Sequence, residues 1–356
     1  LGDPTRHMGA RLPGSKLSAL FYQVNRNKKS VALSIKNPAG VAVIKKIIKS
    51  CDVLLEGFRP GMLDELGLGY EALRTEFPEL IYCSISGYGA DGPYKSRAGH
   101  DGNYLALSGL LSVNGPKERP VLPGFQLADL GGGTWPAVAG ILAALFDRTR
   151  TGVGRRLDVG MLDGAFAFWP LQAGEYQASG VEPGRESMFL NGKFPNYRIY
   201  ATQDSRFVML GALEERFLRA FFRKLGQEQV FVELQGELRQ GSFSRLEAVL
   251  GDLFAGRPMA GWEPFFADEE CCLAPVLTFS EACANEQILF RKMWQIPENG
   301  APGMIGNPLL PGEPICRRMP PELGEDTEAV LSHVGFTGAE LDDLHKRRVI
   351  ALPGVS

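Results

Sequence analysis

Histidine is scarce in this 356-residue sequence, with four residues scattered along the chain. The six cysteines form no Cys-x-x-Cys pair, and with so few histidines they offer no zinc-ligand spacing. The chain is too long for a small disulfide scaffold, so we expect reduced, mostly buried thiols in a cytoplasmic protein. The sequence therefore predicts neither a zinc site nor a disulfide framework.

Strong net charge and long apolar runs are also missing. A formal charge of −3 gives no reason to expect nucleic acid or an anionic membrane as a partner. The longest apolar run, 135–146, falls short of the roughly 20 residues that a membrane-spanning helix needs, and we expect a buried helix there. The chain begins with Leu1 and a polar, glycine-rich stretch without a signal-peptide pattern, so we expect an N-terminal piece to be missing.

The first part of the chain alternates between strand and helix patterns. Apolar runs at 30–35, 52–55 and 80–85 predict strands. Between the first two, Asn37 and Pro38 are typical of a helix start. This order predicts an α/β fold with a Rossmann-like parallel sheet covered by helices. No Gly-x-Gly-x-x-Gly motif follows a strand, which argues against a nicotinamide dinucleotide.

The pattern changes after Pro195. Residues 174–195 are rich in glycine and polar side chains and are typical of a linker. Beyond them, 197–202 and 206–210 predict two antiparallel strands, and a helix with an aromatic face follows. We therefore expect a smaller α+β domain at 197–290.

The segment from Arg97 to Tyr104 contains a histidine, His100, followed at once by Asp101 and flanked by glycines. Imidazole titrates near neutral pH, and a glycine lets the chain approach a ligand closely. This pattern suggests a proton carrier, but a surface turn that happens to contain histidine explains it equally well.

Three carboxylates elsewhere are candidates, each with a structural alternative. Asp129 precedes a triple glycine, 131–133, and either supplies a base or caps the following helix. The glycines either admit a ligand or allow close helix packing. Glu214 lies at a strand-to-helix junction, where glutamate is common because of the helix dipole. Asp163 lies in the apolar segment 159–170, so it should have a hydrogen-bond partner or a role.

Together these blocks resemble a known family. The run from Gly99 to Leu105 is similar to the signature of α-methylacyl-CoA racemases, a branch of the class III CoA-transferase superfamily (the CaiB/BaiF group). Residues 128–133 and 211–214 resemble two further blocks of that group, in the same order and at similar spacing. Residues 56–61 and 274–277 match as well, so the resemblance covers nearly the whole chain.

The resemblance implies an interlocked homodimer. It also implies a large CoA-binding domain built from both ends of the chain, here 1–185 and 300–356, with the small domain between them. Members of the group usually begin with a strand and helix that carry the first CoA loop. That unit is absent here, so we expect a sheet without its first strand.

The resemblance further implies roles for individual residues. His100 and Asp129 would be the two proton-transferring bases, Glu214 would be hydrogen-bonded to His100, and the amide of Asp101 would stabilise the thioester oxygen. The substrate would be a CoA thioester, with no metal or redox cofactor. Its expected binding residues are Leu33, Ser34, Ile35, Lys36, Gly57, Phe58, Arg59, Gly99, Gly102, Asn103 and Tyr104.

Three functions remain open at this point. The first is a racemase or epimerase of 2-methylacyl-CoA thioesters, which moves a proton from one face of the α-carbon to the other through an enolate-like intermediate. The second is a CoA transferase in which Asp163 attacks an acyl-CoA to form an anhydride. The third is a non-catalytic or truncated protein that binds CoA thioesters.

Overall fold

The computed structural model describes residues 2–352 except 14–15, 269, 298–301 and 315. By its contacts the chain forms two compact units. The first consists of Leu1–Arg97, Gly133–Gly160 and Phe279–Ser356, and the second of Ala98–Gly132 and Met161–Thr278. The domain boundaries expected from the sequence, which differ from this division into units, stay a prediction.

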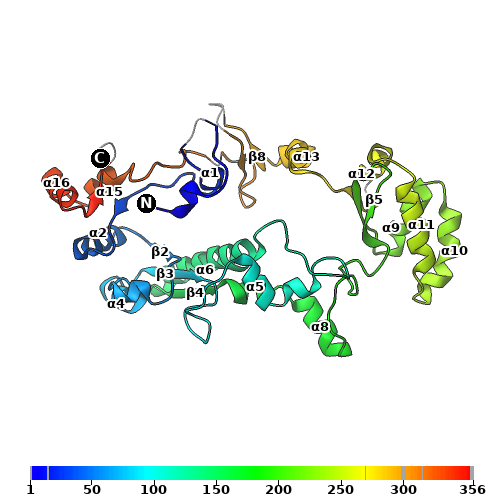
Figure 1. The fold of residues 1–356 in the computed structure, drawn as a ribbon, viewed down its shortest axis with the longest axis horizontal. Coiled ribbons are helices and arrows are strands. Elements are labelled where there is room, and N and C mark those ends of the chain that lie inside the picture. Colours follow the sequence, from blue (N-terminus) through cyan, green and yellow to red (C-terminus); the bar gives the residue numbers. More distant parts are fainter. Residues whose placement is uncertain (1, 14–15, 269, 298–301, 315, 353–356) are drawn as a thin grey trace. The chain divides into compact units, whose positions relative to one another are not determined.

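A parallel sheet lies at the centre of the first unit. Its strands are β2 (Val53–Glu56), β3 (Ile81–Ser86) and β4 (Arg156–Gly160), in that order and all parallel, as the sequence predicted. Helix α6 (Trp135–Thr151) contacts β3 and β4 (Figure 1). The first four residues of β3 are buried, which is expected of a parallel strand covered on both faces.

Three helices from the N-terminal part of the chain pack on this sheet: α2 (Pro38–Ile48), α3 (Met62–Glu65) and α4 (Tyr70–Glu76). The predicted helix start is confirmed, since the Asn37 side chain accepts a hydrogen bond from the Ala39 N–H at 3.0 Å. Apolar residues of all three helices share one core with β3, namely Ile48, Leu63, Leu68, Leu73, Leu80 and Tyr82.

The predicted first strand does not join the parallel sheet. Only β1 (Ala32–Leu33) forms there, and it pairs antiparallel with β10 (Ile350–Ala351) from the C-terminal end. Its backbone donors are taken by the same end of the chain, because the Thr327 hydroxyl accepts the Ala32 N–H at 3.0 Å. The expectation that 30–35 is a strand of the parallel sheet was therefore wrong. The local sequence pattern does not show which distant strand a segment pairs with.

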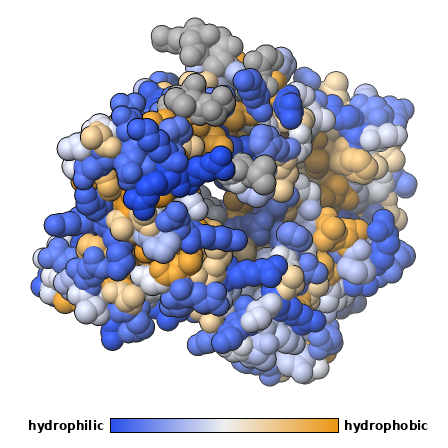
Figure 2. Space-filling view, turned by 60° about the vertical axis from the view of Figure 1, so that its left-hand side comes forward, coloured by the Kyte–Doolittle hydropathy of each residue, from blue (hydrophilic) through white to orange (hydrophobic). Residues whose placement is uncertain are grey.

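Helix α6 also differs from its prediction. With the π-helical turn that precedes it, it forms one helix over Ala128–Thr151, which by length and composition alone is long and apolar enough to span a membrane. The expected burial is wrong as far as the chain's own contacts go, since Leu142 and Phe146 are 58% and 67% exposed. Hydrophobic residues reach the surface in several other places (Figure 2). An amphipathic sequence pattern does not reveal what covers a face.

The second unit contains an antiparallel sheet packed on helices. Strands β5 (Tyr197–Ala201) and β6 (Phe207–Gly211) form the predicted hairpin, and β7 (Leu273–Pro275) pairs with β6. Tyr200, Val208 and Leu210 point into a core that centres on Trp262, Phe221 and Phe254. The surrounding helices, seen at the right of Figure 1, are α9 (Glu215–Lys224), α10 (Glu228–Arg239) and α11 (Ser244–Ala255).

The rest of the second unit is helical. Helices α5 (Asp101–Leu107) and α7 (Met161–Phe166) contact each other. The expected linker is partly helix, because α8 (Pro170–Ser179) extends into it. The second unit also contains η2 (Leu110–Val113), η4 (Met259–Trp262) and α12 (Glu263–Phe266).

The first unit has further short elements at both ends of the chain. They are η1 (Pro4–His7), α1 (Ala19–Val24), α13 (Phe279–Ala284), α14 (Glu286–Phe290), β8 (Trp294–Gln295), β9 (Met304–Ile305), α15 (Thr327–His333) and α16 (Gly338–Lys346).

The glycine at position 164 gives a direct test of this packing. A Cβ atom there would fall onto the carbonyl oxygen of Gly132, which is main chain and cannot swing aside. We expect Gly164→Ala to destabilise the protein by about 1–3 kcal/mol, as overpacking typically does. Gly236→Ala, in the open middle of α10, should instead stabilise it by about 0.5–1 kcal/mol. Urea unfolding of both variants measures the difference, and equal stabilities would contradict the close contact.

Candidate active site

His100 begins helix α5 and is held in place by its neighbours. It is the N-cap residue, with an extended backbone and an exposed side chain. The Asn103 side-chain oxygen accepts the His100 N–H at 3.0 Å, and the buried Tyr104 donates its hydroxyl proton to the Gly99 carbonyl at 2.7 Å. The segment is therefore a fixed helix start with an imidazole that solvent can reach.

The carboxylate of Asp101 makes a contact that the sequence did not reveal. Its Oδ1 accepts the backbone N–H of Ala128 at 2.7 Å and that of Asp129 at 3.0 Å. These two residues open the π-helical turn η3 (Ala128–Thr134), whose first N–H groups have no partner within the helix. An aspartate in the first turn of a helix is common for dipole reasons alone, so the sequence carried no signal for this second role.

Asp129 lies half-buried in the same electrostatic environment as His100. Burial raises the pKa of the Asp129 carboxyl, and the negative charge of Asp101 raises it further. The charge of His100 acts in the opposite direction and lowers that pKa. The Asp129 N–H also donates to Asp101, the neighbour of His100, so the structure holds in one cluster the two residues that the sequence singled out as bases.

Asp163 lies on α7, the third helix of this cluster. Gly132 of η3 and Gly164 of α7 approach so closely that neither has room for a side chain. The triple glycine therefore serves helix packing, which is the structural alternative to a ligand site. The Asp163 side chain is exposed although the surrounding sequence is apolar. It has an interaction partner, as expected of a carboxylate in such a segment. Of the short helix α7 only Ala165 is buried, so its apolar neighbours do not enclose the carboxylate.

Glu214 is the N-cap residue of α9, with an exposed side chain that does not cap the helix. Its negative charge helps to raise the pKa of the Cys272 thiol, after the larger effect of burial. Glu214 thus lies between β6 and α9. Its hydrogen bond to His100 stays a prediction.

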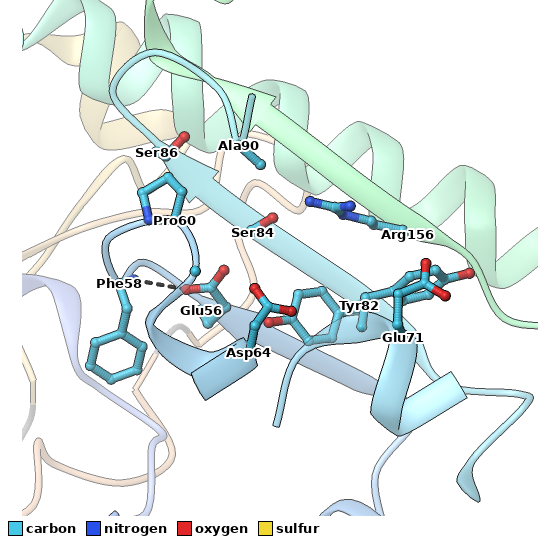
Figure 3. A pocket seen from close by; sticks show the side chains of 12 residues that line it. Glu56, Phe58, Pro60, Asp64, Glu71, Tyr82, Ser84, Ser86, Ala90 and Arg156 are labelled. Atoms are coloured by element: carbon cyan, nitrogen blue, oxygen red, sulfur yellow. Dashed lines mark hydrogen bonds between the residues drawn. The ribbon is translucent and has the colours of Figure 1, made fainter. Parts of the chain in front are cut away.

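The expected CoA-binding loops of the first unit follow β1 and β2. In the loop 33–36, the Ser34 N–H donates to the Val349 carbonyl at 2.8 Å, which fixes it to the C-terminal end of the chain. In the loop 57–59, the Phe58 N–H donates to the Glu56 carboxylate at 2.8 Å (Figure 3). Phe58 and Arg59 are both exposed, so this loop presents an aromatic ring and a guanidinium to solvent.

A small polar cavity of about 70 Å³ opens beside this loop, along one face of the parallel sheet. Its lining runs from Arg156 at the start of β4 to Glu56 at the end of β2. Figure 3 shows Glu56, Asp64 and Tyr82 side by side, with Arg156 across the strands. The sequence did not single out Asp64, Tyr82 or Arg156. Tyr82, Ser84 and Ser86 alternate along one face of β3, and this period is the signal by which that face could have been found.

Burial and neighbouring charges shift the pKa values of two groups that line this cavity, the Glu56 carboxyl and the Tyr82 hydroxyl. Burial raises the pKa of the Glu56 carboxyl, and the hydrogen bond from the Phe58 N–H opposes it. Burial, with the charges of Glu56 and Asp64, also raises the pKa of the Tyr82 hydroxyl. Within the part of the chain that the structure describes, no three His, Cys, Asp or Glu side chains are grouped so that they could hold a metal ion.

Sequence and fold place this chain among the CoA-processing proteins. Residues 1–327 match the model of CoA-transferase family III, and the chain belongs to this family. It is 34% identical to human α-methylacyl-CoA racemase over 95% of this chain and 88% of that protein. It is 32% identical to mouse succinyl-CoA:glutarate CoA-transferase over 94% of this chain and 78% of that protein. Its relatives are thus enzymes of two kinds, racemases and CoA-transferases.

Solved structures agree with this assignment. The crystal structure of a CaiB/BaiF family protein from Brucella suis superposes with a TM-score of 0.78 and 28% sequence identity, over 94% of this chain and 89% of that one. The mixed α/β fold with a parallel sheet is therefore the fold of the family, as the sequence predicted.

The raised pKa of Asp129 predicts a pH-dependent gain in stability on neutralising it. The ionised carboxylate is disfavoured in the folded state, so Asp129→Asn should raise the free energy of unfolding at neutral pH. The gain should vanish as pH falls below the ordinary aspartate pKa of about 3.9, because both states of the wild type are then protonated. Urea unfolding as a function of pH measures it.

A matched variant should behave in the opposite way. The pKa of Asp204 is lowered, chiefly by a hydrogen bond from the Thr202 hydroxyl, so Asp204→Asn should lose stability at neutral pH. If the advantage of Asp129→Asn grows on acidification instead of vanishing, the pKa of Asp129 is not raised by folding.

Proposed function

We propose that this protein is a racemase or epimerase of 2-methylacyl-CoA thioesters. One observation carries the proposal: Asp101, the residue after the accessible His100, accepts the backbone N–H of the half-buried Asp129 at 3.0 Å, which holds the two candidate bases in one cluster. Inversion at the carbon next to a thioester needs a base on one face and an acid on the other. A neutral imidazole and an ionised carboxylate can each act as the base for one enantiomer.

In this mechanism one of the two residues removes the α-proton and the other returns a proton to the opposite face. The thioester oxygen gains negative charge in the enolate-like intermediate, and a fixed N–H donor lowers the energy of that charge. Asp101 is the first residue of α5, so its N–H has no acceptor in a preceding helical turn, and we assign it this role. The raised pKa of Asp129 suits a group that must alternate between acid and base.

The remaining expected residues would bind the rest of the substrate. The loops at 33–36 and 57–59 would hold the CoA moiety, and Glu214 would orient His100. The similarity to human α-methylacyl-CoA racemase over nearly the whole chain supports an acyl-CoA substrate. In our proposal no metal or redox cofactor takes part, because proton transfer next to a thioester needs neither.

A CoA transferase is the second candidate, and the exposure of Asp163 favours it. A nucleophilic carboxylate must reach the acyl carbon, and Asp163 is exposed on a helix that contacts α5. The similarity to mouse succinyl-CoA:glutarate CoA-transferase supports the same candidate. The Asp163 carboxylate oxygen would attack the acyl-CoA, release the CoA thiolate and leave a mixed anhydride on Asp163.

Exchange of the α-proton separates the candidates. In deuterated water, a racemase should introduce deuterium at the α-carbon of a 2-methylacyl-CoA. His100→Ala should slow this exchange by roughly 10²–10⁴-fold, the usual contribution of a general acid or base. His333→Ala, which removes an exposed histidine at the end of α15, should leave it unchanged.

The other outcomes identify the alternatives. Wild-type protein without exchange, but with a hydroxylamine-trapped adduct on Asp163, would replace the racemase with the transferase. A protein that binds CoA thioesters and does neither would be non-catalytic. Exchange that survives His100→Ala intact would exclude the two-base mechanism.

We also propose a cytoplasmic homodimer, interlocked as the family resemblance implies. The large apolar side chains that α6 leaves exposed, Leu142 and Phe146 among them, support an association that covers them. Sedimentation equilibrium should give twice the 38.8 kDa mass of one chain. A mass of one chain, unchanged by concentration, would rule the dimer out.

A further inference from the structure

We propose that Asp101 is a positioning residue, because its carboxylate fixes the backbone of Asp129 beside His100. The inference rests on the proposed function for its catalytic meaning, but not for its geometry. It concerns the Asp101 side chain, whereas the proposed mechanism uses only the Asp101 backbone N–H.

The hydrogen bonds leave little freedom at this point. One oxygen of Asp101 accepts both N–H groups, at 2.7 and 3.0 Å, and Ala128 is fully buried. If this acceptor is removed, a buried N–H loses its partner, which is costly. Because His100 and Asp101 are adjacent in the chain, the same two bonds tie the backbones of both proposed bases together.

A second contact holds η3 further along the turn. Three residues after Asp129, Gly132 packs against main-chain atoms of Met161 and Ala165 in α7. The turn η3 is therefore held by α5 at its first two residues and by α7 at Gly132. The Asp101 carboxylate supplies the polar half of this attachment, and the glycine contact supplies the steric half.

The charge of Asp101 adds a second effect. The titratable groups that act on Asp129 from α5 are Asp101 and His100, and the titratable group of α7 is Asp163. The negative charge of Asp101 raises the pKa of Asp129. A variant that keeps the acceptor oxygen and loses the charge should therefore lower that pKa without releasing the backbone.

Two variants separate position from charge. Asp101→Asn keeps an oxygen that can accept both N–H groups, and Asp101→Ala keeps none. Hydrogen–deuterium exchange of the peptide that covers residues 124–134 should be faster in Asp101→Ala, by about tenfold at Ala128 and Asp129, because each amide loses a hydrogen bond to a charged acceptor. It should be near the wild-type rate in Asp101→Asn.

This measurement needs no enzymatic activity, so it stands even if the protein proves not to be a racemase. Unchanged amide exchange in a folded Asp101→Ala, with wild-type circular dichroism, overturns the positioning role. If Asp101→Ala does not fold, amide exchange as fast in Asp101→Asn as in the unfolded chain overturns it, and protection in Asp101→Asn supports it.

Activity then tests the catalytic meaning. With a 2-methylacyl-CoA in deuterated water, Asp101→Ala should lower kcat on the order of 10²-fold with KM little changed, as misplacement of a catalytic group does. Asp101→Asn should restore most of kcat and move the acid limb of the pH profile to lower pH. Asp343→Asn, which removes an exposed carboxylate paired with Arg347, should change neither.

The outcomes are distinguishable. If the wild type shows no α-proton exchange, the proposed function is refuted. The positioning role is then tested by amide exchange alone. Full activity in Asp101→Ala, or an acid limb that stays in place in Asp101→Asn, refutes the corresponding part of the inference.

Discussion

The hydrogen bonds from the Ala128 and Asp129 amides to the Asp101 carboxylate are the interaction on which the candidate site depends. They join two helices that are well separated in sequence, and they do so at the residue next to His100. A helix start exposes N–H groups that need acceptors. Here one carboxylate accepts two of them, and it thereby links the backbones of the two proposed bases, His100 and Asp129.

The same cluster contains the residues of both candidate mechanisms. In the proposed racemase His100 and Asp129 transfer protons next to a thioester, and in the alternative transferase Asp163, which is exposed on α7, attacks the acyl carbon. Gly132 and Gly164 bring the helices that carry these groups into main-chain contact. The relatives of this chain include racemases and CoA-transferases, which is consistent with a shared frame in which different side chains react.

In the first unit, the loops expected to bind CoA are also held in place by hydrogen bonds. The loop after β1 is held by the C-terminal end of the chain through β10 and Val349, so residues from both ends build one region. The loop after β2 is ordered by the Glu56 carboxylate, whose own pKa is raised by burial beside Asp64 and Tyr82. Phe58 and Arg59 of this loop are exposed.

Elements with local causes could be predicted from the residues alone. The Asn37 cap, the buried strand β3 and the hairpin of β5 and β6 follow from residue types within a few positions, and the blocks around His100, Asp129 and Glu214 identify the family. The pairing of β1 with β10, the exposure of Leu142 and Phe146 and the exposure of Asp163 became known only from the folded chain. The folded chain also shows that Asp101 accepts the amides of η3. These features depend on which surfaces meet across long stretches of chain, and neither periodicity nor propensity carries that information.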